Sequence, residues 1–249
     1  MLRKFVTASA LTALLATPLA AFDMNAMNDA ERQTFRDEIR AYLMDNPEVL
    51  LEAISVLEER QAAEQAAGDI DLIRTNADDL FNDGYSYVGG NPDGDITVVE
   101  FLDYRCGYCK KAHPEVKELI SSDGNIRIIT KEYPILGDQS VLASRFAIAV
   151  LAVQGDAAYA ATNDALMTMR GAITEESLSN LSEQSGYDTP AVFAAMNSDE
   201  TKAIIDENRA LAQRLQINGT PSFVFETEML RGYVPLDGMK QVVAQLRAN

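Results

Sequence analysis

The two cysteines of this chain, Cys106 and Cys109, lie three positions apart where a β-rich run gives way to a helical one. The run 96–104 is apolar enough for a central strand, and the pattern from 106 to 122 is helical. A second β-rich run covers 125–132. This order of strand, helix and strand predicts a right-handed crossover between parallel strands. The thiols are therefore expected at the end of a buried strand, where a helix begins.

The counts of a few residue types exclude several classes of site and partner. Two cysteines cannot form a four-cysteine zinc site or a framework of several disulfides within one chain. A single histidine excludes a multi-histidine metal site within one chain. Because 38 acidic residues outnumber 21 basic ones, the net charge of −17 disfavours nucleic acid or an anionic membrane as the main partner.

The rest of the chain divides into a helical block and a short β-rich end. Residues 138–214 show no strand pattern, and helices are expected near 139–154, 157–170, 174–185 and 199–215. Strands are expected at 222–226 and 229–231, followed by a helix over 236–248. The fold predicted from these patterns is an α/β protein whose sheet is interrupted by a helical insertion at 138–214.

Residues 1–21 have the features of a secretory signal peptide. Arg3 and Lys4 precede an apolar stretch, small residues follow, and cleavage is predicted after Ala21. The alternative is an apolar N-terminal anchor, but the stretch is too short to span a bilayer comfortably. Export places the chain in an oxidising compartment, the bacterial periplasm. In that compartment, a C-x-x-C motif indicates a redox-active site more than a structural disulfide.

Residues 22–83 are predicted to form a helical oligomerisation segment ahead of the main domain at 84–249. A first helix begins at Asp29, a break is expected at Asn46-Pro47, where Asn46 would cap the second helix, and Gly68 is expected to end it. A short helix over 70–81 should bury Ile70, Ile73, Ala77 and Leu80. Helices without strands between them cannot bury their apolar stripes alone. They must pack on the main domain or on another copy of the chain.

The position of the two thiols predicts unequal reactivity. At a helix start, free backbone N–H groups and the helix dipole stabilise negative charge, so the pKa of Cys106 should fall below about 8.5. Cys109 lies one turn further in, less exposed and within reach of a disulfide. This asymmetry suits disulfide exchange, in which Cys106 attacks and Cys109 resolves the mixed disulfide. There are three alternatives. The two cysteines could form half of a zinc site shared with another chain, a Cu(I) site on both thiolates, or a structural disulfide.

The stretch resembles the active site of the thioredoxin fold, specifically that of the DsbA-like periplasmic thiol–disulfide oxidoreductases. Glu100 lies six residues before the first cysteine, Pro114 lies five after the second, and 218–224 resembles the family's cis-proline loop. The dipeptide Gly107-Tyr108 is the one found in DsbC-type isomerases. The charged N-terminal helices resemble the ScsC-like subgroup, whose members can trimerise through such a segment and are often linked to copper tolerance.

The resemblance implies a role for each matching residue. Glu100, on a strand face with Val98 and Leu102, is expected to be partly protonated or paired, and is implied to relay a proton to or from Cys109. Gly107 and Tyr108 tune the thiolate and the fit of the substrate. Thr220-Pro221 is expected to be a cis peptide that exposes the Thr220 backbone to a bound client. The redox-active pair Cys106–Cys109 takes the place of a cofactor.

The predicted function is a periplasmic thiol–disulfide oxidoreductase that acts on unfolded or misoxidised exported proteins. An isomerase or reductase is favoured, because several active sites in a dimer or trimer hold one client between attacks. Tyr108 in place of DsbA's histidine predicts a weaker oxidant than DsbA. The alternatives are a monomeric DsbA-like dithiol oxidase, a Cu(I)-binding protein using Cys106 and Cys109, and a client-holding chaperone. A membrane redox partner of the DsbD or DsbB type is implied by the resemblance.

Overall fold

The computed structural model describes residues 26–248, and the predicted signal peptide at 1–21 lies outside this range. The chain divides into two compact units, and the boundary between them falls between Glu59 and Arg60. The boundary lies inside one helix, α2 (Glu48–Thr75). No helix of the described residues is long and apolar enough to cross a membrane.

The first unit contains α1 (Asp29–Asp45) and the beginning of α2. Asn28 starts α1, because its side chain accepts from the Glu31 backbone at 3.0 Å and the Glu31 carboxylate accepts from the Asn28 backbone at 2.9 Å. The predicted break at Asn46-Pro47 is confirmed. The predicted cap is wrong, however, because the Asn46 side chain donates to the Tyr42 carbonyl at 2.8 Å and so closes α1 instead of opening α2.

The second unit begins with the remainder of α2, which continues through Gly68 to Thr75 and is followed by α3 (Ala77–Phe81). The predicted helix end at Gly68 is wrong, because one internal glycine costs a helix only about 1 kcal/mol and packing offsets this. Ile73 and Leu80 are buried, and Asp69 is held by Arg231 through two bonds of 2.6 and 2.7 Å. Ile70, expected to be buried, is 45% exposed.

Five strands form one sheet in the order β1-β3-β2-β4-β5. They are β1 (Tyr87–Gly90), β2 (Ile96–Leu102), β3 (Ile126–Glu132), β4 (Ser222–Phe225) and β5 (Glu228–Arg231). β2 and β3 are parallel and are joined by α4 (Gly107–Asp123), as predicted, and the other pairs are antiparallel. The sequence pattern predicts a short strand over 85–88, but β1 starts only at Tyr87, because Asp83 accepts from the backbones of Tyr85 and Ser86 and holds them in a turn.

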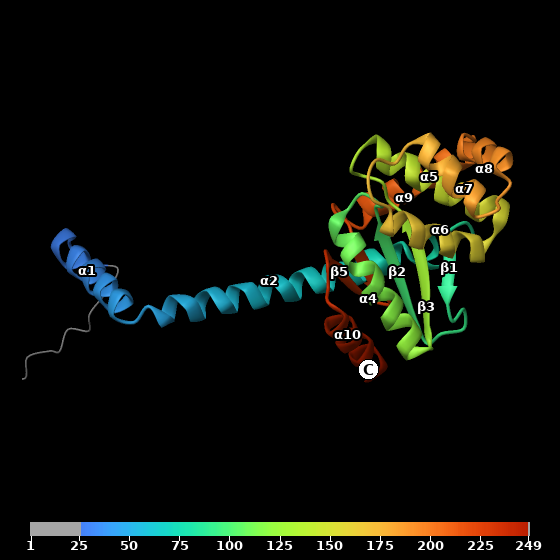
Figure 1. The fold of residues 1–249 in the computed structure, drawn as a ribbon. Helices are drawn as coiled ribbons and strands as arrows, with labels where there is room; N and C mark the ends of the chain where they lie inside the picture. Colours follow the sequence, from blue (N-terminus) through green and yellow to red (C-terminus); the bar gives the residue numbers. More distant parts are fainter. Residues whose placement is uncertain (1–25, 249) are drawn as a thin grey trace, which may run out of the picture. The chain divides into compact units, whose positions relative to one another are not determined.

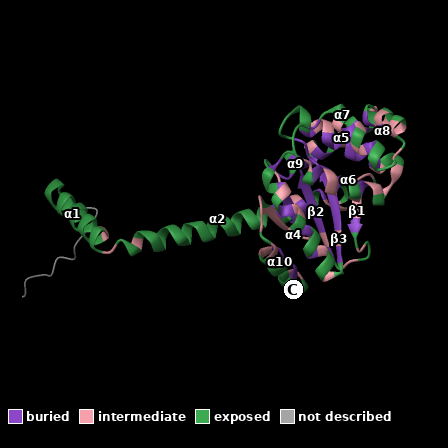
Figure 2. Ribbon diagram, in the orientation of Figure 1, coloured by how far each residue is buried: buried purple, intermediate pink, exposed green. Residues whose placement is uncertain are grey.

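Helices cover both faces of the sheet (Figure 1). α4 and α10 (Leu236–Ala248) pack on the face that carries Val98 and Phe223. The end of α2, α3 and α9 (Asp199–Arg214) pack on the face that carries Val99 and Phe101. Figure 2 shows that the central strands are buried. β2 therefore ends inside the domain, at the start of α4.

The predicted helical insertion is present as α5 (Asp138–Gln154), α6 (Asp156–Thr168), α7 (Glu175–Gln184), α8 (Thr189–Met196) and α9. The sequence pattern predicts a break around 186–190 and no helix between there and 199, so α8 was missed. Asp188 instead caps this helix by accepting from the Ala191 backbone at 3.1 Å, and Pro190 occupies its first turn. Apolar side chains of the insertion form a buried cluster that packs against Tyr104 and Cys109. The insertion therefore contributes to the surroundings of the thiols.

Candidate active site

The turn between β2 and α4 places Cys106 immediately before the helix. Cys106 is the N-cap residue of α4, and its backbone N–H donates to the Asp103 carbonyl at 3.0 Å. The buried Asp103 carboxylate accepts from the backbones of Arg105 at 2.8 Å, Ile135 at 2.8 Å and Leu136 at 3.0 Å. These bonds fix the turn against the segment that follows β3. The thiol is thereby held at the N-terminus of a helix.

The two thiols are free and differ in exposure and acidity. Cys106 is 8% exposed and Cys109 is completely buried. A hydrogen bond from the Cys109 thiol, assisted by the backbone N–H groups of Cys109 and Tyr108, lowers the pKa of Cys106 to about 5. The same hydrogen bond, together with burial, raises the pKa of Cys109. The pair thus consists of an acidic outer thiol and a protonated inner one.

The loop before β4 brings the second predicted motif to the thiols. The Thr220-Pro221 peptide is cis, as expected. The Cys106 thiol, when protonated, donates to the Thr220 carbonyl at 3.1 Å, although the two residues are 114 positions apart. Gly107 and Tyr108 are exposed beside them, Tyr108 by 63%. The structure therefore gathers Cys106, Cys109, Tyr108 and the cis-proline loop in one place.

Glu100 is buried in the middle of β2, where it pairs in register with Thr130 and Phe223. Its Oε1 atom has no hydrogen-bond partner among the described residues. Burial, and then the charge of Glu132, raise the pKa of Glu100 to about 8. Glu100 is one of the residues that line a cavity of about 220 Å³. Glu100 therefore holds a proton at neutral pH and has space beside it.

A second buried carboxylate, Glu132, was not predicted. It accepts from the Tyr104 hydroxyl at 2.7 Å and from the Tyr159 hydroxyl at 2.6 Å. Burial raises its pKa to about 7, although both tyrosine bonds oppose the shift. The alternation of side chains between the two faces of β3 could have indicated its position. Thr130 pairs with Glu100, and Glu132 lies two residues further along β3, so it shares the face of Glu100. Its partners come from distant segments, which the pattern could not reveal.

His113, the single histidine, lies on α4 and is packed rather than exposed. Its side chain is 13% exposed, and Nε2 is 2.7 Å from Asp164 of α6. Burial lowers its pKa. Among residues 26–248, no group of three or more histidine, cysteine or acidic side chains is placed to hold a metal ion. Cys106 and Cys109 are two soft sulfur ligands within hydrogen-bonding distance of each other.

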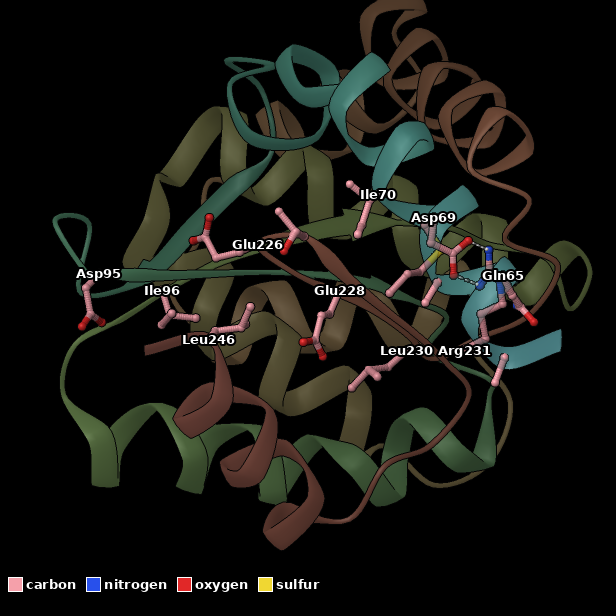
Figure 3. Close-up of a pocket in the computed structure, with 14 residues that line it drawn as sticks. Gln65, Asp69, Ile70, Asp95, Ile96, Glu226, Glu228, Leu230, Arg231 and Leu246 are labelled. Carbon is pink, nitrogen blue, oxygen red and sulfur yellow. Dashed lines mark hydrogen bonds and ion pairs between the residues drawn. The ribbon is translucent and has the colours of Figure 1, made fainter. Parts of the chain in front are cut away.

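A large cavity of the second unit, about 920 Å³, is lined by neither of the thiols. It follows β5 and the last part of α2, and Figure 3 shows Asp69 and Arg231 paired in its wall. Glu226, Glu228 and Asp95 contribute further acidic groups to the lining. No cysteine lines it, and its one arginine is already bound to Asp69. Its size alone does not make it the reaction centre.

Comparison with known proteins matches two parts of this chain to families. Residues 97–244 match the family described as a DSBA-like thioredoxin domain, and residues 31–64 match the copper resistance protein ScsC N-terminal domain. A thioredoxin-like oxidoreductase from Silicibacter pomeroyi DSS-3 is 41% identical with a TM-score of 0.65, covering 69% of this chain and 98% of that one. Proteus mirabilis ScsC in a transitional conformation is 28% identical with a TM-score of 0.65, covering 90% and 98%.

The first curated relatives are longer proteins. A Na(+)/H(+) antiporter NhaA 1 of Salinispora arenicola is 28% identical over 164 residues, which are 66% of this chain. This chain spans 25% of that relative's length. The first family match, in contrast, includes most of the sheet, both cysteines and the cis-proline loop. The chain therefore belongs to the DsbA-like thioredoxin family of thiol–disulfide oxidoreductases, and it is ScsC-like in joining that domain to an ScsC-type N-terminal segment.

Proposed function

We propose that this protein is an exported disulfide isomerase or reductase that acts on misoxidised proteins as an oligomer. The observation that carries the proposal is the difference in exposure and acidity between the two thiols. Cys106 is the outer, acidic thiol, and Cys109 is the buried thiol that holds its proton. With a pKa of about 5, Cys106 is a thiolate at neutral pH and a good nucleophile.

The exchange follows from this inequality. The Cys106 thiolate attacks one sulfur of a client disulfide, forms a mixed disulfide and releases the other client sulfur as a thiolate. In isomerisation, that thiolate attacks another client disulfide, and a client thiolate finally displaces Cys106. In reduction, Cys109 loses its proton and attacks the Cys106 sulfur. This second route releases the client as a thiol and leaves the Cys106–Cys109 disulfide, which a membrane partner of the DsbD type would reduce.

The client backbone is proposed to bind beside the cis-proline loop. Thr220 lies next to the Cys106 sulfur, and Gly107 and Tyr108 are open to solvent on the other side. A backbone contact does not depend on the client's side chains, so it suits an enzyme with many unfolded clients. Tyr108 supplies an exposed ring next to the bound chain.

Glu100 is proposed to take the proton of Cys109 during the reductive route. The Cys106 hydrogen bond and burial are the main causes that raise the pKa of Cys109, and Glu100, when ionised, raises it further. The two groups are therefore close enough to interact electrostatically. The cavity beside Glu100 reaches the polar side chains of His113, Asn163 and Asp164. Its volume of about 220 Å³ exceeds the roughly 30 Å³ that one water occupies, so it can hold water that receives and passes on the proton.

Glu100→Gln is expected to slow resolution of the mixed disulfide by up to about 10²-fold, since a positioned base is lost. In the wild type, the rate of this step should rise as Glu100 ionises near pH 8, and this rise should be absent in the variant. Because the carboxyl pKa is raised by folding, the stability that Glu100 contributes is lost as the pH rises from about 4.5 to 8. The variant should therefore be more stable than the wild type at pH 8. Stopped-flow resolution rates and urea unfolding at several pH values measure both effects.

Glu118→Gln is the matched control, because Glu118 is an exposed carboxylate on α4. It should change neither the pH profile nor the slope of stability with pH. An unchanged rise near pH 8 in Glu100→Gln would rule out Glu100 as the base. A loss of stability at pH 8 would show that Glu100 is needed in its charged form for structure.

The N-terminal helices are proposed to join copies of the chain. α1 buries none of its residues, although Phe35, Ile39 and Tyr42 repeat at helical spacing and are 41%, 43% and 54% exposed. In α2, Leu50, Ile54 and Leu57 repeat the pattern and are 48%, 51% and 54% exposed. Apolar stripes of this kind are covered by other helices, and a second copy of the chain offers the same stripe.

Two ribonuclease assays separate the proposed activity from the alternative of a dithiol oxidase. The reduced protein is incubated with scrambled ribonuclease, and the disulfide form is incubated with reduced ribonuclease. An isomerase restores activity to the scrambled enzyme, whereas fast oxidation without such recovery identifies an oxidase. The Cu(I) alternative has one favourable observation, the free and adjacent thiols, and titration of the reduced protein with Cu(I) against a chelator tests it.

A further inference from the structure

Tyr233, in the loop between β5 and α10, lies against the exposed residue of the C-x-x-C motif. The rings of Tyr108 and Tyr233 have centroids 6.2 Å apart and an interplanar angle of 30°. This separation falls within the range of favourable aromatic pairs. Tyr108 remains 63% exposed, so most of its surface is open to a bound molecule.

The position of Tyr233 is fixed by two side chains of α4. Its hydroxyl donates to Glu115 of α4 at 2.7 Å, and the other oxygen of Glu115 accepts from the Leu236 backbone at 2.9 Å. The Lys111 ammonium lies 4.1 Å from the centre of the Tyr233 ring, a cation–π contact. The ring therefore has a defined orientation next to α4.

The loop that carries Tyr233 is also bonded to the client-binding loop. The Gly232 backbone N–H donates to the Pro221 carbonyl at 2.9 Å, and Tyr233 follows directly. The Thr220 carbonyl on the other side of this proline is 3.1 Å from the Cys106 sulfur. A client backbone held at Thr220 would thus carry its neighbouring side chains past Tyr108 and Tyr233.

We propose that Tyr108 and Tyr233 form a subsite for an aromatic side chain adjacent to the reacting cysteine of the client. This inference rests on the proposed disulfide exchange at Cys106. Two rings held at a shallow angle offer π surface, which favours another ring over an aliphatic side chain of similar size. Tyr233 is then a specificity-determining residue outside the C-x-x-C and cis-proline motifs.

Three symmetric peptide disulfides test the subsite. Each half carries one cysteine, preceded by Phe, Leu or Ala, so attack on either sulfur releases the same peptide thiol. The reduced full-length protein should reduce the Phe peptide about 3- to 10-fold faster than the Leu peptide in kcat/KM, the scale of one aromatic pair. In Tyr233→Ala, this Phe-to-Leu ratio should fall to about 1. In Tyr233→Phe, which keeps the ring and loses the bond to Glu115, the ratio should be retained.

The control variant Lys240→Ala, on the exposed face of α10, should keep the wild-type ratio. A wild-type protein that reduces the Leu peptide as fast as the Phe peptide would overturn the subsite and leave the exchange function intact. A ratio that survives in Tyr233→Ala, or a rate that falls equally for all three peptides, would also overturn it. Failure to reduce any of the peptides would contradict the proposed exchange function itself.

Discussion

Cys106→Ser is expected to abolish disulfide exchange, lowering the rate by more than about 10³-fold, the scale on which loss of a covalent nucleophile acts. Cys106 is the thiol at the helix start, with a pKa of about 5, and Cys109 cannot replace it because it is completely buried. The measurement is the rate at which the reduced protein cleaves a fluorescent peptide disulfide.

Cys109→Ser is the matched variant, because it removes the other sulfur and leaves the nucleophile. It should still attack, and it should accumulate a mixed disulfide with the client, visible as a covalent complex on a non-reducing gel. In Cys109→Ala, which has no side-chain donor, the loss of the hydrogen bond should also raise the pKa of Cys106 above about 5. Activity that survives in Cys106→Ser, or a covalent complex formed through Cys109, would contradict the assigned roles.

Breaking the apolar stripe of α1 should convert the protein into a monomer and lower isomerase activity about 10-fold or more, since avidity between linked sites is lost. Ile39 and Tyr42 are exposed on one face of α1, so the double variant Ile39→Glu and Tyr42→Glu removes the stripe without disturbing a buried core. Light scattering gives the mass, and recovery of scrambled ribonuclease gives the activity. Reduction of a small peptide disulfide, which needs one site, should be unchanged.

Arg36→Glu provides the control, because Arg36 is an exposed residue of α1 outside the apolar stripe. It changes the charge of the helix but should leave the oligomer and the isomerase activity in place. A wild-type protein with a monomeric mass would remove the basis for the oligomer. A double variant that is monomeric and fully active on scrambled ribonuclease would show that the helices do not serve isomerisation.

The sequence was most informative where local pattern and chemistry agreed. β2, α4 and β3 were predicted because the apolar strands, the cysteines and the helical pattern follow one another without interruption. The cis-proline loop was recognised only because Thr220-Pro221 belongs to a motif known from a family, since nothing in the sequence brings residue 220 near residue 106. Their contact depends on the antiparallel pairing of β2 and β4.

The sequence was least informative where long-range packing decides the local structure. Gly68 suggested a helix end, but the burial of Ile73 and the pairing of Asp69 with Arg231 continue the helix. In the sequence, nothing distinguishes Glu132 from any other charged residue on a strand. Its environment is made by Tyr104 and Tyr159, which lie 28 and 27 positions away. The buried carboxyl pair of the site could not be inferred before the helical insertion was placed.

The rate of alkylation as a function of pH tests the central claim, the inequality of the two thiols, most directly. The reduced protein is treated with iodoacetamide between pH 3 and 9, and mass spectrometry identifies the modified cysteine. Modification should be confined to Cys106, with a rate that titrates at a pKa of about 5. Titration near about 8.5, the value of an ordinary thiol, or equal modification of Cys106 and Cys109, would contradict it.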